Sequence, residues 1–177
     1  NIDKTVAAVQ EAVGEAERAA GVEAHSVYVG IAGDHIQSFQ SRGVISSRTG
    51  EITQHDVDRL LEDTQHVAMP ADRRILHVIP QEFIVDGQDG VADPIGMSGI
   101  RLEANVHIIT GLVSAAKNVY RCIEKAAYEI ADIVLEPLAS SYAVLHQDEK
   151  EIGVALVDIG GGTTDIAVFE DNTIRHT

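Results

Sequence analysis

The sequence is poor in basic residues, in cysteine and in long apolar runs. Of its 177 residues, 13 are Lys or Arg against 28 Asp or Glu, which gives a formal net charge of −15 at pH 7. A surface with this charge repels phosphate backbones, so we expect no nucleic-acid partner. The single cysteine, Cys122, cannot form an internal disulfide. Its place in an apolar helical pattern predicts a buried thiol in a protein of the reducing cytosol.

No apolar run reaches the ~18 residues that a membrane-spanning helix needs, and no signal-peptide pattern opens the chain. We therefore expect that this segment does not cross a membrane. A hydrophobic content of 45% is enough for a globular core. The first residue is Asn1 and a helical pattern starts at once, so we expect the chain to be a piece of a longer protein.

What is present is an alternation of helical and extended patterns, which predicts a mixed α/β fold. The periodicity predicts helices over 3–20, 53–69, 113–130 and 138–147, and strands over 26–33, 35–48, 74–87, 101–111 and 132–136. Thr53 and Asp56 have the spacing of a capping box, and Pro80 indicates a sheet edge or a bulge. The charged run 146–151 is typical of a solvated connection.

The composition changes near residues 25 and 111. Between them lies a strand-helix-strand-strand pattern that could form its own small sheet, and its long loop "DGQDGVADPIGMSGI" is suited to a surface that another chain contacts. The flanking segments have the pattern of a different α/β core. We therefore predict a core with an inserted interaction subdomain over 25–111.

The stretch "VDIGGGTTDIAVF" (157–169) is the candidate binding motif. It matches neither the P-loop pattern nor the G-x-G-x-x-G pattern, and strands on both sides predict a β-hairpin whose glycines adopt positive φ. Unpaired N–H groups in such a turn form a nest for phosphate. The predicted phosphate contacts are Gly160, Gly161, Gly162, Thr163 and Thr164.

Two aspartates flank this loop. Asp158 is placed to orient a water ligand of a phosphate-bound Mg²⁺ ion, and it is the predicted metal residue. Asp165 either hydrogen-bonds the hairpin turn or approaches the nucleotide, and we favour the turn. The alternative to a phosphate cradle is a plain glycine hairpin. No catalytic residue stands out.

The D-x-G-G-G-T-x-D motif resembles the second phosphate loop of the actin, sugar-kinase and heat-shock chaperone ATPase superfamily. With "HVIPQEF" (77–83), "GMSGIRLEA" (96–104) and "EPLASSYAVL" (136–145), the whole chain is similar to the FtsA family of bacterial cell-division proteins. The resemblance implies an actin-like ATPase core with an inserted strand-helix-strand-strand (SHS2) subdomain. Its implied ranges are 1–24 and 112–150 for subdomain 1A, 25–111 for subdomain 1C, and 151–177 for the start of subdomain 2A.

The same resemblance implies a function. Proteins of this family bind ATP with Mg²⁺ and have at most slow ATPase activity. They polymerise at the cytoplasmic side of the inner membrane at the division septum, tether the FtsZ ring and recruit later division proteins. By this resemblance, residues 25–111 serve self-association and the late division partners. The FtsZ site and the C-terminal membrane helix would lie in parts that this chain lacks.

Two alternatives stay open. A pilus-assembly adaptor would share the actin-like core and the inserted subdomain, although "HVIPQEF" favours division. A sugar-kinase-like phosphotransferase would need a base carboxylate beside a substrate cleft, and the sequence offers no clear candidate.

Overall fold

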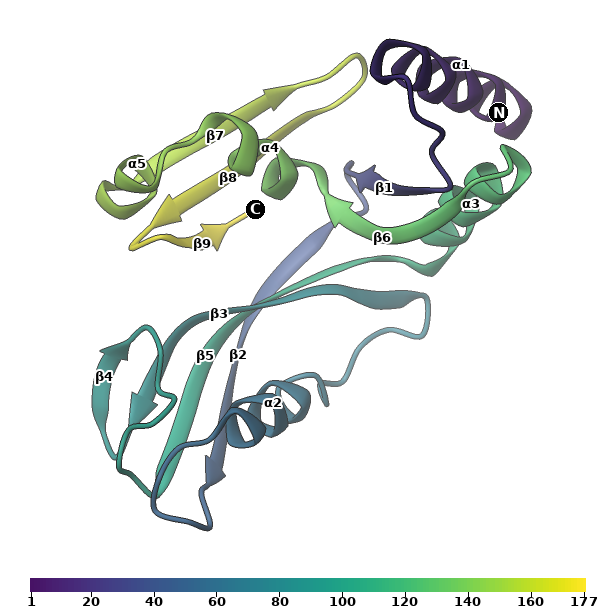
Figure 1. Cartoon of the computed structure of the whole chain (residues 1–177). Helices are drawn as coiled ribbons and strands as arrows, with labels where there is room; N and C mark the ends of the chain where they lie inside the picture. Colours follow the sequence, from purple (N-terminus) through teal and green to yellow (C-terminus); the bar gives the residue numbers. More distant parts are fainter.

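The computed structural model describes all residues 1–177 as an arrangement of short sheets and helices (Figure 1). The helices are α1 (Ile2–Ala20), α2 (Gln54–Asp63), α3 (Val113–Lys125), α4 (Glu136–Val144) and α5 (Gln147–Ile152). The strands are β1 (Ser26–Ile31), β2 (Gln37–Ser46), β3 (Arg73–Val85), β4 (Gln88–Val91), β5 (Arg101–Leu112), β6 (Glu129–Leu135), β7 (Val154–Ile159), β8 (Thr164–Glu170) and β9 (Thr173–His176). None of the helices combines the length and the apolarity that crossing a membrane requires.

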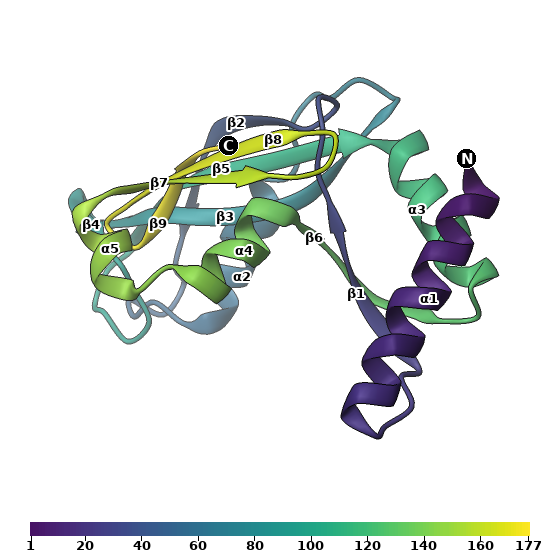
Figure 2. The same cartoon turned by 90° about the horizontal axis from the view of Figure 1, so that it is seen from above.

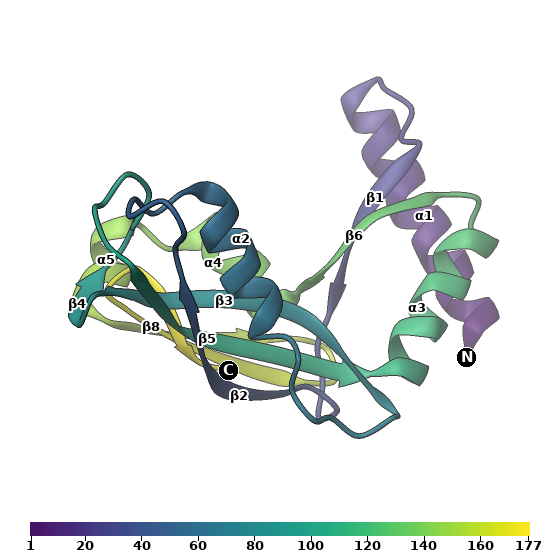
Figure 3. The same cartoon turned by 90° about the horizontal axis from the view of Figure 1, so that it is seen from below.

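The inserted unit, residues 37–112, is a four-stranded antiparallel sheet with the strand order β2-β5-β3-β4. Helix α2 covers one face of this sheet (Figure 3). Alternate residues of β5 point toward the helix because side chains alternate across a strand. Leu102, Ala104, Val106 and Ile108 are fully buried there beside Leu60 of α2. Gly43 of β2 lets the helix approach closely, since a Cβ atom at that position would lie 2.8 Å from Leu60 Cδ1.

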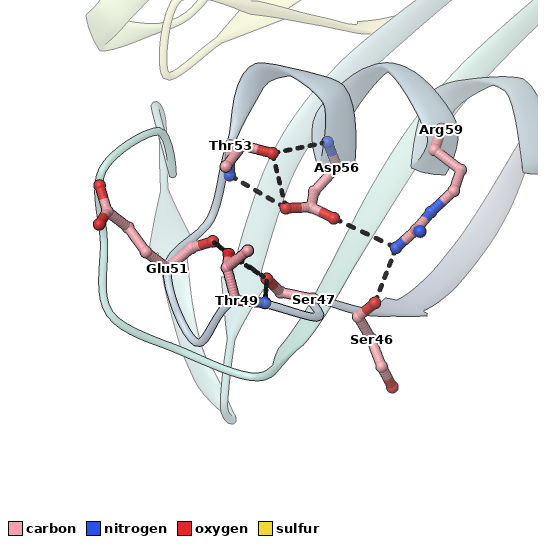
Figure 4. Close-up of polar contacts among 7 residues, drawn as sticks. All are labelled: Ser46, Ser47, Thr49, Glu51, Thr53, Asp56 and Arg59. Carbon is pink, nitrogen blue, oxygen red and sulfur yellow. Dashed lines mark hydrogen bonds and ion pairs between the residues drawn. The ribbon is translucent and has the colours of Figure 1, made fainter.

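The junction before α2 is held by the polar network drawn in Figure 4. Thr53 Oγ1 accepts a hydrogen bond from the Asp56 N–H, and the Asp56 carboxylate accepts one from the Thr53 N–H at 3.1 Å. The predicted capping box is therefore confirmed. Arg59 bonds both Asp56 and the carbonyl of Ser46, which ties the helix to the end of β2. The Thr53 hydroxyl, more than any other contact, lowers the pKa of Asp56.

The first core part, residues 1–36 and 113–145, contains α1, β1, α3, β6 and α4. Strands β1 and β6 form a parallel pair, and Ile31 pairs with Leu135 at its end. The predicted range of the inserted subdomain, 25–111, includes β1, but β1 pairs with no strand of the inserted sheet. The partner of β1 is separated from it by about a hundred residues, a distance that local periodicity does not encode.

The second core part, residues 146–177, contains α5 and the antiparallel sheet β7-β8-β9. A small cluster of Ala167, Phe169 and Ile174 forms its core. Seen from above, this sheet lies over the inserted sheet, on the face opposite α2 (Figure 2). The molecule thus places α2, the inserted sheet and the β7-β8-β9 sheet in three successive layers.

Several predicted boundaries are corrected. The helix predicted over 53–69 ends at Asp63, and the helix predicted over 113–130 ends at Lys125 because Ala127 adopts a φ of 69°. The charged run 146–151 forms most of the short helix α5 instead of a plain connection. Pro80 lies where the register between β3 and β5 shifts, which confirms the predicted bulge. The four predicted subdomain ranges stay a prediction.

Candidate functional site

The glycine loop connects β7 to β8. Ile159 before it and Thr164 after it are the paired residues that flank it. One backbone hydrogen bond closes the turn, from the Gly160 N–H to the Thr163 carbonyl at 3.0 Å. The N–H groups of Gly161, Gly162 and Thr163 donate to no protein acceptor. All of these residues are exposed. The loop therefore offers three neighbouring backbone donors to a ligand, and donors of this kind suit an anion.

The reason for the glycines differs from the one we predicted. None of Gly160, Gly161 and Gly162 has a positive φ, so the turn does not require the left-handed region. A Cβ atom at Gly161 or Gly162 would meet no atom within 4 Å. Glycine here leaves open space next to the free N–H groups, and a side chain would occupy the space that a ligand of these groups would need.

Asp158 lies at the end of β7, directly opposite Asp165 of β8. Directly opposed side chains share one face of an antiparallel pair, and like charges in this arrangement repel. Ser140 of α4 donates a hydrogen bond to Asp158 Oδ2 at 2.7 Å, which leaves Oδ1 free. Asp165 Oδ1 accepts a long hydrogen bond of 3.4 Å from the N–H of Gly33, in the turn after β1. Asp165 therefore connects the start of β8 to the turn after β1, in the other core part, instead of serving its own hairpin turn as we favoured.

Glu136 is a third acidic residue at this position, and the sequence analysis missed it. Partial burial raises the pKa of Glu136, and the negative charges of Asp165 and Asp158 raise it further. Gly30 of β1 makes room for it, because a Cβ atom at Gly30 would lie 2.7 Å from Glu136 Cγ. A glutamate directly before a proline that opens a helix, at the end of a buried strand, was the available sequence signal.

These carboxylates suit a hydrated cation. The pKa of Glu136 is raised first by partial burial and then by the charges of Asp165 and Asp158, and a divalent cation with its waters would relieve the repulsion between these charges. No group of three His, Cys, Asp or Glu side chains is placed to hold a metal ion directly. A Mg²⁺ ion at this position would keep its waters, and Asp158 stays the residue predicted to orient them.

Thr163 and Thr164 line an adjacent hollow of about 540 Å³ together with Gly33, Asp34 and Asp165. The hollow lies between the hairpin of the second core part and the turn after β1 of the first. The structure therefore brings the predicted loop residues next to a segment more than a hundred residues earlier in the chain. The roles of Asp158, Gly160, Gly161, Gly162, Thr163 and Thr164 stay predictions.

The fold places the protein in the actin-like fold class. A chain of a solved PilM-PilN type IV pilus biogenesis complex superposes with a TM-score of 0.59, over 96% of this chain and 46% of that chain. The sequence identity is 14%, so this likeness concerns the fold alone. The predicted fold class, an actin-like core with an inserted subdomain, is confirmed.

The sequence comparisons define the family within that class. A family model described as the SHS2 domain inserted in FtsA matches residues 33–110. The whole chain is 51% identical to the cell division protein FtsA of Pseudomonas aeruginosa, 50% to that of Neisseria meningitidis and 40% to that of Escherichia coli K12. It spans 42%, 43% and 42% of the length of these relatives. The chain belongs to the FtsA family of cell division proteins.

Proposed function

We propose that this chain is the part of an ATP-binding, actin-like cell-division protein that carries one phosphate loop and the inserted interaction subdomain. The whole protein polymerises at the cytoplasmic face of the inner membrane at the division septum, tethers the FtsZ ring and recruits later division proteins. The observation that carries the proposal is the identity to FtsA proteins of 40% to 51% along the whole chain. The inserted subdomain serves self-association and the late division partners.

The geometry supports the nucleotide part of the proposal. The three free N–H groups of the loop and the hydroxyls of Thr163 and Thr164 are donors for the β- and γ-phosphates of ATP. Asp158 orients the waters of Mg²⁺, which neutralises phosphate charge when it is bound. Glu136, whose pKa is raised, is the group suited to orient or deprotonate a water, and this agrees with slow hydrolysis.

The pilus-assembly alternative finds support only in the shared fold, because identity to the PilM-PilN chain is 14%. The phosphotransferase alternative gains a carboxylate in Glu136. No feature of the described residues indicates a second substrate. Cell division is therefore the function that the observations favour.

The test is calorimetric titration of MgATP into the full-length protein and two variants. Gly161→Val fills the open side of the loop and Asp158→Asn removes the metal-orienting charge. Each charge-assisted hydrogen bond is worth about 1.5–3 kcal/mol, so the loss of one weakens binding by about 10- to 100-fold. Gly14→Val, at an open helix position, is the matched control and leaves binding unchanged. Unaltered binding by both site variants would overturn the assignment.

A second measurement uses this 177-residue chain alone. An actin-like site holds the triphosphate between two loops, and this chain carries one of them. The loss of two or three phosphate donors weakens binding by about three to six powers of ten. We expect millimolar binding or weaker. Tight ATP binding by this chain would show that the cradle lies elsewhere.

A further inference from the structure

The stretch "HVIPQEF" (77–83) has no role in the site described so far, although it lies in the middle of β3. Strand β4 pairs with β3 only at Phe83 and Val85. The edge of β3 before Phe83 is therefore not covered by another strand of its own sheet. Strand β3 itself lies beside both core parts, against β6 of the first and β9 of the second (Figures 1 and 2).

His77 contacts the first core part. Its Nε2 accepts a hydrogen bond of 3.0 Å from the N–H of Leu135. Strand β6 pairs only with β1, so His77 satisfies an N–H on the opposite, open edge of β6. Leu135 is 2% exposed and directly precedes Glu136, the first residue of α4. His77 accepts at Nε2 only in its neutral form, and burial lowers its pKa, which favours that form.

Gln81 contacts the second core part. The register between β3 and β5 shifts between Pro80 and Glu82, so Gln81 has no partner on β5. Its buried side chain donates a hydrogen bond from Nε2 to the carbonyl of Ile174 in β9 at 2.8 Å. Between the two contacts, Ile79 packs on the cluster of Ala167, Phe169 and Ile174. Strand β9 pairs with β8, and β8 begins directly after the glycine loop.

We propose that β3 of the inserted unit links the two core parts, with His77 and Gln81 as positioning residues that fix the end of β6 relative to the glycine-loop hairpin. The two contacts are four residues apart on one strand, about 13 Å. A hydrogen-bonded strand resists bending and stretching. A movement of one core part against the other must therefore break one contact or move the inserted sheet. The functional meaning of this link rests on the proposed nucleotide site, but the link itself is testable without nucleotide.

The first experiment measures amide hydrogen exchange by NMR in this 177-residue chain without nucleotide. Gln81→Met removes the donor at β9, and His77→Leu removes the acceptor at β6. His77→Leu leaves the Leu135 N–H without a partner, so its exchange accelerates by about 5- to 100-fold. His77→Gln keeps an acceptor and restores protection. Gln65→Met and His66→Gln, both at exposed positions near the end of α2, are the matched controls.

A link differs from local packing in one measurable way: a change at one contact alters exchange at the other, distant contact. Gln81→Met removes a hydrogen bond to β9, yet a linked β3 requires that it also accelerates exchange at Leu135. The effect at Leu135 in the double variant is then smaller than the product of the two single effects, since either change already releases the link. Unchanged Leu135 exchange in Gln81→Met, or independent multiplicative effects, would overturn the proposal.

A second arm uses the full-length protein with MgATP. Bound nucleotide slows Leu135 exchange in the wild type, and Gln81→Met reduces this slowing while ATP still binds. Full slowing in Gln81→Met contradicts a link that acts on the site. If the wild type binds no ATP, the proposed function fails, and the nucleotide-free exchange in the shorter chain still decides whether β3 links the two parts.

Discussion

The inserted unit and the two core parts differ in how completely each buries its own apolar residues. The inserted unit has a core cluster of nine buried residues that α2 and the sheet share. The second core part has a cluster of three. Helix α1 of the first core part has 19 residues and none of them is buried. The inserted unit is thus self-sufficient in its packing, and the core parts are not.

The outer face of the β7-β8 hairpin shows the same difference. Val157, Ile159 and Ile166 point away from α4 and are 49%, 78% and 51% exposed. In an amphipathic strand pair, the apolar side chains of one face normally pack against a second layer of the protein. The chain spans less than half the length of its FtsA relatives. The insertion therefore carries its own stability, while the β7-β8 hairpin contributes little.

The largest expected effect tests this comparison directly. Leu60→Ala removes a fully buried side chain from the inserted core and lowers the free energy of unfolding by about 2–5 kcal/mol. Ile159→Ala removes the same number of carbons from the exposed hairpin face and costs less than about 0.5 kcal/mol. Urea unfolding followed by circular dichroism measures both. Equal costs would contradict the difference between the two regions.

A helix cap gives the next largest effect. Thr53→Ala removes the capping-box hydroxyl of α2 and costs about 1 kcal/mol. Thr5→Ala removes a hydroxyl from the exposed first turn of α1, where the only partner is the Asn1 carbonyl, and leaves stability unchanged. The urea concentration at the midpoint of unfolding, compared at an unchanged dependence of the unfolding free energy on urea, distinguishes the two variants. A cost for Thr5→Ala as large as that for Thr53→Ala would show that α1 contributes to stability as α2 does.

We expect the stability of the protein to depend on pH through two histidines at the boundary between the regions. Burial lowers the pKa of both His77 and His107 below the ordinary value of 6.5, and nearby His176 lowers that of His107 further. The unfolded chain therefore binds more protons than the folded chain, so stability is complete above pH ~6.5 and falls as the pH drops through the folded-state pKa values. Urea midpoints at pH 7.5, 6.5 and 5.5 measure this decline.

The double variant His77→Gln and His107→Gln is the control for that decline. Glutamine does not titrate, so its urea midpoint changes less over the same pH range. The pKa of Glu136 is raised, and a raised carboxyl pKa contributes with the opposite sign, which the comparison with the variant removes. An identical decline in the variant would assign the pH dependence to other groups.

The smallest expected effect concerns the site. Glu136→Gln removes a charge that partial burial and the carboxylates of Asp165 and Asp158 disfavour. Because Glu136 remains solvent-exposed, solvent screening limits the gain at pH 7 to about 0.5 kcal/mol or less. The same variant of the full-length protein binds MgATP normally and hydrolyses it more slowly. Unaltered hydrolysis would remove Glu136 from the proposed site.

The local elements and the family could be predicted from the sequence alone. Helical periodicity located α1 within one residue of its start, and the Thr53–Asp56 spacing predicted the cap that the structure confirms. The D-x-G-G-G-T-x-D motif between two apolar runs predicted the β7-β8 hairpin. These features depend on residues that are close in the chain, so their patterns are visible without a fold.

Which distant segments meet could be seen only in the tertiary structure. It paired β1 with β6 and brought Asp165 to Gly33. It also showed that the loop glycines leave open space beside the backbone and do not adopt the left-handed conformation. Only the structure showed that Glu136 lies beside Asp158 and Asp165, and that His77 and Gln81 have partners on β6 and β9. The physical reason is that burial, charge repulsion and strand pairing are properties of a three-dimensional neighbourhood, which residues far apart in the sequence create together.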